Sequence, residues 1–359
     1  MATQFNDNDL EQLDINSDIL EDEYNSEYGE EDEEEDNGKT KIVHIIFLVL
    51  LIIMIGIIAF LLIRWQKGIK LGLDSSTQKA EYATEPIDFY VPFHPEEIEG
   101  YTDDGEYNIY IFSDGSAGEL DDPSSVASII AAETGANVTV LNRDEGTISL
   151  HEKSYTLDHP EDAFSLYYII MAITSGSEGD YDLLLNAAQT IQDDGVCYQY
   201  WDTIHPIDFS KADVILLYYG MYDYLDGREF IGEEVYSQQE YGTPNSVNGA
   251  MDSCLKMLNE RFPYTQILVA SPSFFYTTDK KGNKIGCDMQ NNGAGTLGEY
   301  VVNLQFVAQM RSVTFIDNYF GLDFNAENTD GYLGEDGMPN DDARQMIARH
   351  IIENIYFMK

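Results

Sequence analysis

Residues 107–116 read YNIYIFSDGS, a short hydrophobic run that ends in polar residues and glycine. Runs of this kind are typical of buried parallel strands, and the loop that follows such a strand often carries function. Four similar runs rich in Val, Ile, Leu or Tyr follow toward the C-terminus. We expect five strands, at residues 107–112, 137–141, 213–219, 266–270 and 313–317.

Amphipathic stretches separate these runs and predict helices. They lie at residues 124–134, 161–173, 246–261 and 296–311, and a last one begins after Asn340. Gly135 suits the C-terminal cap of the first helix, and Asn340 suits the N-terminal cap of the last. This alternation predicts an α/β domain at residues 107–359, a three-layer, doubly wound, flavodoxin-like fold around a parallel five-stranded sheet.

Ligands of such sheets bind in the loops at the carboxyl ends of the strands. The loop after the first strand is Ser113-Asp114-Gly115-Ser116, and the loop after the second contains Gly146. The two remaining motifs are Gly220-Met221-Tyr222-Asp223 after the third strand and Glu335-Asp336-Gly337-Met338-Pro339 before the last helix. We therefore expect these four segments to surround one cleft.

In these motifs, and in their order along residues 107–358, the chain resembles the SGNH, or GDSL-type, hydrolase superfamily. That family has Gly-Asp-Ser after the first strand, a glycine after the second, Gly-x-Asn-Asp after the third and Asp-x-x-His-Pro before the last helix. The resemblance implies the same fold, and a cleft that acts on acyl esters, often of sugars outside the cell.

The residues that would perform the chemistry differ from the family pattern. Gly115 stands where the family has its nucleophilic serine, Tyr222 where it has the oxyanion-hole asparagine, and Met338 where it has the general-base histidine. The aspartate that orients the histidine falls at Glu335, with Asp336 next to it. The scaffold positions match the family: Asp114, Gly146, Gly220, Asp223 and Pro339.

Two hypotheses follow, because glycine carries no nucleophile and a thioether cannot accept a proton from a hydroxyl. In the first, the protein is catalytically impaired and binds an acylated cell-envelope glycan or a protein partner through the former active-site cleft. In the second, it is an active carbohydrate esterase or acyltransferase with a displaced nucleophile, Ser116 or Ser113, and Glu335 or Asp336 as base.

Composition narrows the remaining classes of ligand. The formal net charge of -46 repels phosphate backbones, so we expect no nucleic-acid partner. The three cysteines have no metal-binding or redox spacing, and we expect them to be buried thiols. The acidic stretch that starts at Asp323 lacks the EF-hand glycine and glutamate, and the chain has no dinucleotide or phosphate-binding fingerprint, so we expect no metal and no cofactor.

The N-terminal part of the chain has a different composition. Residues 1–38 contain sixteen acidic residues and no Lys or Arg, which predicts a disordered tail. Residues 42–63 are apolar except for two, and at about 1.5 Å per residue they are long enough to cross a bilayer. The run begins at Ile42 and ends at Ile63, where Arg64 and Trp65 favour an uncleaved anchor over a signal peptide. Residues 74–106 are expected to be a linker.

The orientation of this single-pass anchor is predicted from two opposing observations. The flank after the apolar run has three basic residues and the flank before it has two, which favours a cytoplasmic C-terminal domain. The resemblance to enzymes that act on acylated sugars favours the opposite. We expect the C-terminal domain outside the cell membrane and the acidic tail in the cytoplasm.

Overall fold

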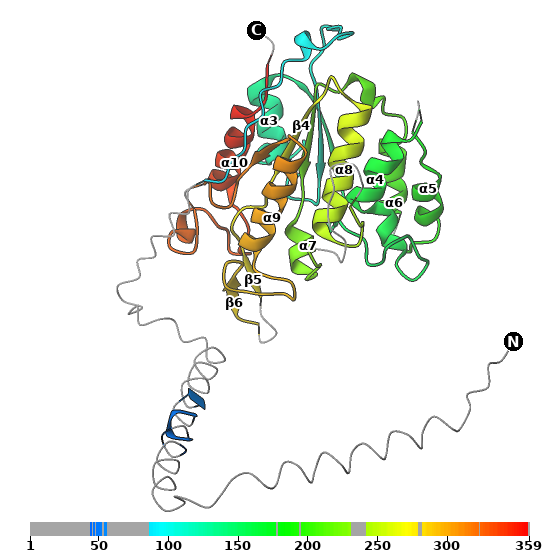
Figure 1. Cartoon of the computed structure of the whole chain (residues 1–359). Coiled ribbons are helices and arrows are strands. Elements are labelled where there is room, and N and C mark those ends of the chain that lie inside the picture. Colours follow the sequence, from blue (N-terminus) through cyan, green and yellow to red (C-terminus); the bar gives the residue numbers. More distant parts are fainter. Residues whose placement is uncertain are drawn as a thin grey trace, which may run out of the picture. The chain divides into compact units, whose positions relative to one another are not determined.

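The computed structural model describes residues 86–357 apart from 177–178, 194, 231–241, 279–281 and 323, together with residues 44, 46, 48–51, 54 and 55. The chain divides into two compact units, Met1–Glu81 and Tyr82–Lys359. The second unit contains the predicted α/β domain, and Figure 1 shows its sheet between layers of helices.

The sheet has five parallel strands in the order β2-β1-β3-β4-β7. Their bounds are β1 Asn108–Ser113, β2 Asn137–Asn142, β3 Val214–Tyr218, β4 Gln266–Ala270 and β7 Thr314–Ile316. The inner strands β3 and β4 are buried along their whole length, because helices cover both of their faces. All five predicted strands are confirmed, in the order expected of a doubly wound sheet.

Helices α3 and α10 pack against each other on one face of the sheet, and α8 packs against α4 and α9 on the other. The helix bounds are α3 Val126–Thr134, α4 Leu166–Thr174, α5 Asp182–Ala188, α6 Val196–Ile204, α7 Met221–Leu225, α8 Val247–Arg261, α9 Leu297–Met310 and α10 Asp341–Glu353. Gly135 ends α3 in a left-handed conformation, and the Asn340 side chain caps α10 by accepting from the Ala343 amide. Both predicted caps are therefore confirmed.

One predicted helix is interrupted. Residues 161–173 form a 3₁₀ helix, Pro160–Phe164, followed by α4, and the two are separated by Ser165. The Ser165 backbone is extended, and its hydroxyl accepts a hydrogen bond from the amide of Tyr168. A serine that caps the second helix in this way stops the first, although the hydrophobic periodicity runs through both.

Residues 86–91 lie along the outer edge of the sheet. Phe89 and Phe315 exchange two backbone hydrogen bonds of 3.0 and 2.8 Å, in antiparallel orientation. The Ile87 amide donates to the carboxylate of Asp317, at 3.0 Å. The described part of the expected linker thus covers the free edge of β7, so the folded unit begins before residue 107.

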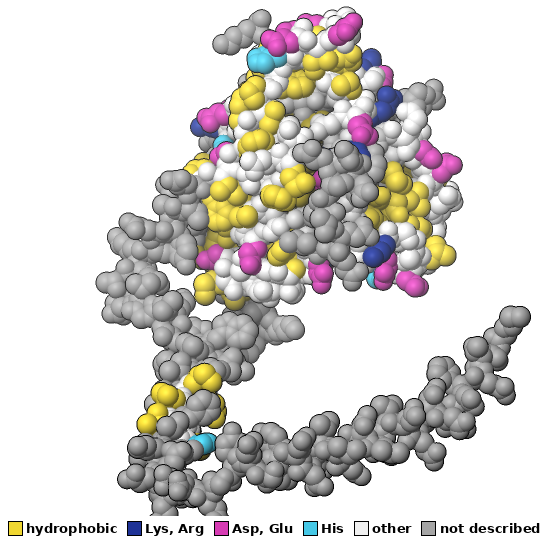
Figure 2. All heavy atoms as spheres, viewed as in Figure 1, with side chains coloured by type: hydrophobic (Ala, Val, Ile, Leu, Met, Phe, Trp, Pro, Cys, Tyr) yellow, Lys and Arg dark blue, Asp and Glu magenta, His cyan; other side chains and the backbone are white. Residues whose placement is uncertain are grey.

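On the face that Figure 2 shows, acidic side chains are scattered with a few basic ones, and apolar side chains gather in patches between them. All three cysteines are buried, as expected, and burial raises the pKa of the Cys197 and Cys287 thiols to about 12. These thiols therefore stay protonated at neutral pH.

The predicted tail at residues 1–38 lies outside the described residues, as does most of the predicted helix at residues 42–63. The eight described positions between His44 and Ile55 are helical and exposed. Within the described residues, no helix is both long enough and apolar enough to span a membrane. The membrane anchor therefore stays a prediction.

Candidate functional site

The first loop begins at Ser113, the last residue of β1. Its side chain is fully buried, and its hydroxyl oxygen accepts hydrogen bonds from the amides of Gly115, at 3.1 Å, and Ala117, at 2.9 Å. The hydroxyl therefore holds the turn together from inside and does not face a cleft.

Asp114 joins the first loop to the third. One carboxylate oxygen accepts from the Ser116 amide at 3.2 Å and from the Ser116 hydroxyl at 2.5 Å. The other oxygen accepts from the Met221 amide, at 3.1 Å. Asp114 is completely buried, and burial raises its pKa to about 6 in spite of these hydrogen bonds.

Gly115 has a backbone conformation that few other residues adopt. Its φ is +104°, and a Cβ built on it would lie 2.9 Å from the Oδ1 atom of Asp144. A serine at this position would therefore be strained, and it would touch the carboxylate of the second loop. The conformation of this turn therefore favours glycine over serine at position 115.

Asp223 connects the second loop to the third. Its buried carboxylate accepts from the amide of Ile148 at 2.7 Å, and from the amide and hydroxyl of Ser149 at 3.1 and 2.8 Å. Gly146 lies two residues before Ile148 and is buried, and a Cβ there would lie 2.7 Å from the Arg143 carbonyl oxygen. Gly220 has a φ of +120° at the start of α7. These three scaffold positions thus have structural roles that explain their identities.

Tyr222 lies on α7 and is half-buried. Burial raises the pKa of its hydroxyl first, and the negative charges of Asp114, Glu145 and Asp144 raise it further. The phenol is therefore within electrostatic range of the carboxylates of the first and second loops. We use the name acidic cleft for Gly115, Asp144, Glu145 and Tyr222, which stand at the positions where the family resemblance places the active-site cleft.

The fourth segment contacts a β-hairpin formed by β5, Tyr276–Thr278, and β6, Lys284–Gly286. The Tyr276 amide donates to the Gly337 carbonyl at 2.9 Å, and Lys284 donates to the Glu335 carbonyl. The side chains of Glu335 and Asp336 are exposed, whereas that of Met338 packs against the hydrophobic core. In the described part of the chain, neither acid makes a hydrogen bond with Ser113 or Ser116.

The sheet order and the hydrogen-bonded first three loops decide the fold type. In fold, the chain resembles the SGNH hydrolases. Similar solved structures include a protein from Lactobacillus plantarum, with 16% identity, a TM-score of 0.45, and coverage of 70% of this chain and 98% of that one. A GDSL-like lipase from Bacteroides ovatus has 10% identity and a TM-score of 0.41, with coverage of 69% and 97%.

A carbohydrate esterase family 2 enzyme from Corynascus thermopiles is a third similar structure, with 12% identity, a TM-score of 0.38, and coverage of 72% of this chain and 68% of that one. No protein-family model and no curated protein matches the sequence. Because every TM-score is below 0.5, the assignment of an SGNH-like fold rests on the sheet order and the loops of this chain.

Backbone amides of the first two loops are hydrogen-bonded within their own loops. The amides of Gly115 and Ser116 donate within their own turn, and the amide of Gly146 donates to the Arg143 carbonyl at 2.8 Å. These amides are therefore not free to bind an oxyanion. In the described residues, no imidazole hydrogen-bonds the hydroxyl of Ser113 or Ser116.

Asp144 is not among the site residues predicted from the sequence. It occupies the space beside Gly115, in the loop that precedes Gly146. Glu145 has a φ of +61°, which non-glycine residues seldom adopt. The sequence carries no motif or periodicity that would have indicated the contact between Asp144 and Gly115.

Proposed function

We propose that the SGNH-like domain is a binding domain that has lost ester hydrolysis, and that residues 42–63 anchor it in a membrane. The observation that carries this proposal is the closed first loop. Both serine hydroxyls and the amides of Gly115 and Ser116 are engaged inside the turn. The amides would have to break these hydrogen bonds to bind an oxyanion, and in the described residues no imidazole contacts either hydroxyl.

The chemistry of the acidic cleft indicates the class of ligand. Asp144 and Glu145 are exposed carboxylates beside the phenol of Tyr222. They disfavour anionic ligands, whereas carboxylates and a phenol can accept and donate hydrogen bonds to a hydroxyl-rich ligand. An uncharged, acylated glycan of the cell envelope fits these groups, and a protein partner with exposed hydroxyl or basic groups is the alternative.

Binding can be tested with acetylated and deacetylated envelope oligosaccharides by titration calorimetry on the full-length chain. We expect binding of the acylated glycan without release of acetate, and loss of binding in Tyr222→Ala. Tyr198→Ala is the matched control, because Tyr198 is an exposed tyrosine on α6, 46% accessible. Equal binding by both variants would remove the acidic cleft as the binding site.

A second candidate function has one observation in its favour. The Ser116 hydroxyl lies 2.5 Å from a carboxylate whose pKa is raised to about 6, a combination that suits general-base catalysis near neutral pH. This supports an active esterase or acyltransferase with Ser116 as a displaced nucleophile.

The same local geometry recurs at two exposed turns elsewhere in the described residues, however. Ser124 donates to Asp122 at 2.8 Å and Ser210 donates to Asp208 at 2.6 Å, in both cases with the serine amide on the same carboxylate oxygen. An aspartate followed two residues later by serine adopts this turn readily. We therefore place the binding function first.

A further inference from the structure

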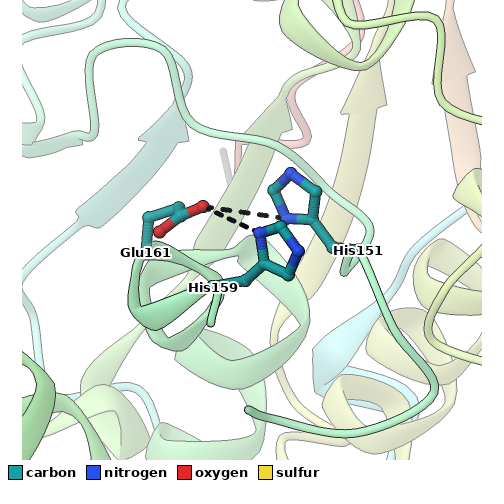
Figure 3. Close-up of side chains that lie close together, drawn as sticks. All are labelled: His151, His159 and Glu161. Atoms are coloured by element: carbon teal, nitrogen blue, oxygen red, sulfur yellow. Dashed lines mark hydrogen bonds and ion pairs between the residues drawn. The ribbon is translucent and has the colours of Figure 1, made fainter. Parts of the chain in front are cut away.

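A cluster of two histidines and a glutamate lies in the long connection between β2 and α4, and the proposed function does not use it. Figure 3 shows His151, His159 and Glu161 with both Nδ1 atoms directed at the glutamate carboxylate. The Glu161 Oε1 atom lies 3.4 Å from His159 Nδ1 and 3.9 Å from His151 Nδ1. One ligand atom from each residue lies within 4.8 Å of the others.

These separations are close to those of a metal site. Zinc binds imidazole nitrogen and carboxylate oxygen at about 2.0–2.2 Å, so two ligands of a tetrahedral site lie roughly 3.3–3.5 Å apart. The distances to Glu161 match this value or exceed it slightly. Small side-chain rotations of partly exposed residues are therefore sufficient to close the triad on an ion.

We propose that His151, His159 and Glu161 bind a divalent transition-metal ion, of the zinc or cobalt class, with one coordination position left open. Two imidazoles and one carboxylate favour such ions over Mg²⁺ and Ca²⁺, which prefer all-oxygen sites. A triad with an open position is the ligand set of catalytic rather than structural zinc sites.

A buried carboxylate holds one of the proposed ligands in place. Asp162 is 2% exposed; its Oδ2 atom accepts from the His151 amide at 2.9 Å, and its Oδ1 atom lies 2.7 Å from His151 Nδ1. Asp162 contacts the same nitrogen, Nδ1, that faces Glu161, so it is not the carboxylate partner on the other ring nitrogen that metal sites commonly have. The ion has to replace this hydrogen bond, while the bond from the His151 amide to Asp162 keeps the backbone in place.

The charges around the cluster also favour a cation. Glu161, Asp162 and Asp226 carry negative charges, and Arg228 contacts both His151 at 3.0 Å and Asp226 at 3.6 Å. Three carboxylates and one guanidinium give a sum of -2, which one divalent ion neutralises.

Metal binding requires that one of the two histidine rings change its orientation. The rings of His151 and His159 are stacked, with centroids 3.8 Å apart and planes 8° from parallel. An ion cannot lie in two parallel ring planes at once, so one imidazole must tilt. His159 borders a polar hollow of about 400 Å³, which gives its side chain room to move and gives the open coordination position access to solvent.

The test is a titration of the full-length, chelator-treated chain with Co²⁺, read by its visible absorption. We expect one equivalent to give the intense spectrum of four-coordinate cobalt, and Zn²⁺ but not Mg²⁺ to displace it. The acidic tail cannot mimic this result, because carboxylate and water ligands leave the ion six-coordinate.

Variants locate the site. We expect His159→Asn and His151→Asn to weaken Co²⁺ binding about tenfold or more. Glu161→Gln should weaken it to the same extent without affecting the fold, because the Glu161 side chain is half-exposed. His94→Asn is the matched control, because His94 is an exposed histidine 3.3 Å from Glu96, outside the cluster. A six-coordinate spectrum, or unchanged affinity in the three cluster variants, would overturn the proposal.

Discussion

Gly115 has a φ of +104° and faces the Oδ1 atom of Asp144. Replacing Gly115 therefore tests whether this turn can accept a serine side chain. We expect Gly115→Ser to lower the free energy of unfolding by about 1–3 kcal/mol, because a side chain is strained in this region of φ. Urea denaturation measures the loss. Gly115→Ala should cost the same, since the strain arises from Cβ; a stabilised Gly115→Ser protein would contradict this account of the turn.

The activity of the same variants is a separate expectation. Gly115→Ser alone and Met338→His alone should leave ester hydrolysis at background, because a serine without a base stays protonated and a base without a nucleophile has nothing to activate. Hydrolysis, if it can be restored, needs at least both changes.

The buried carboxyl of Asp114 predicts a pH dependence of stability. Its pKa is about 6 in the folded state against 3.8 in the unfolded chain, so the folded state binds more protons between these values. Stability from this group is present below about pH 4 and is lost as the pH rises through about 6. The difference of roughly two pKa units corresponds to about 3 kcal/mol.

Urea titrations at several pH values measure this effect as the difference between the wild type and Asp114→Asn. Asp208→Asn is the control with the opposite sign. There the hydrogen bond from Ser210 lowers the pKa of the carboxyl, so its stabilising contribution is lost as the pH falls. If the free energies of unfolding of the wild type and of Asp114→Asn change with pH in the same way from pH 4 to pH 7, Asp114 does not titrate in this range.

At the level of elements, a buried ion pair joins α8 to the C-terminal end of α9. The Arg311 guanidinium contacts the Asp252 carboxylate through two hydrogen bonds of 2.6 Å, and the side chains are 9% and 2% exposed. We expect Arg311→Ala to lower the free energy of unfolding by about 3–5 kcal/mol, because it leaves a buried carboxylate without its partner.

Arg349→Ala is the matched control for this change. Arg349 pairs with Glu133 at 3.3 Å, also between two helices, but the side chains are 58% and 38% exposed. Such a pair is worth at most about 1 kcal/mol. Thermal or urea unfolding should therefore show a clearly larger loss of stability for Arg311→Ala than for Arg349→Ala. Equal losses of stability would mean that water or repacked side chains replace the buried ion pair.

The elements that the sequence predicted best are those whose signals are local. Strands such as β3 and helices capped by Ser246 or Asn340 follow from composition and capping residues alone. Helices α5 and α6 were not predicted, because they are short and pack mainly on each other. The β5–β6 hairpin was not predicted either, because each of its strands has only three residues.

The candidate site was predictable only in outline. The motif order placed Gly115, Gly146 and Tyr222 at the carboxyl ends of neighbouring strands, which the parallel sheet confirms. Asp144 beside Gly115 and the stacking of His151 on His159 depend on loop conformation between residues distant in sequence. No periodicity or motif encodes such contacts.

At the scale of the whole molecule, the orientation of the proposed anchor at residues 42–63 decides which ligands the domain can meet. We expect an added protease to digest the C-terminal domain on intact cells, because the proposed glycan ligand lies outside. The control is the same digestion after the cells are made permeable. Protection of the domain in intact cells would place it in the cytoplasm, as the count of flanking basic residues favours.

Covalent labelling by a fluorophosphonate probe shows most directly whether the closed first loop contains an activated serine. We expect the full-length chain to stay unlabelled under conditions that label an active serine esterase, and Ser116→Ala and Ser124→Ala to behave like the wild type. Labelling of the wild type that is lost in Ser116→Ala but kept in Ser124→Ala would contradict the account and assign Ser116 as the nucleophile of an active enzyme.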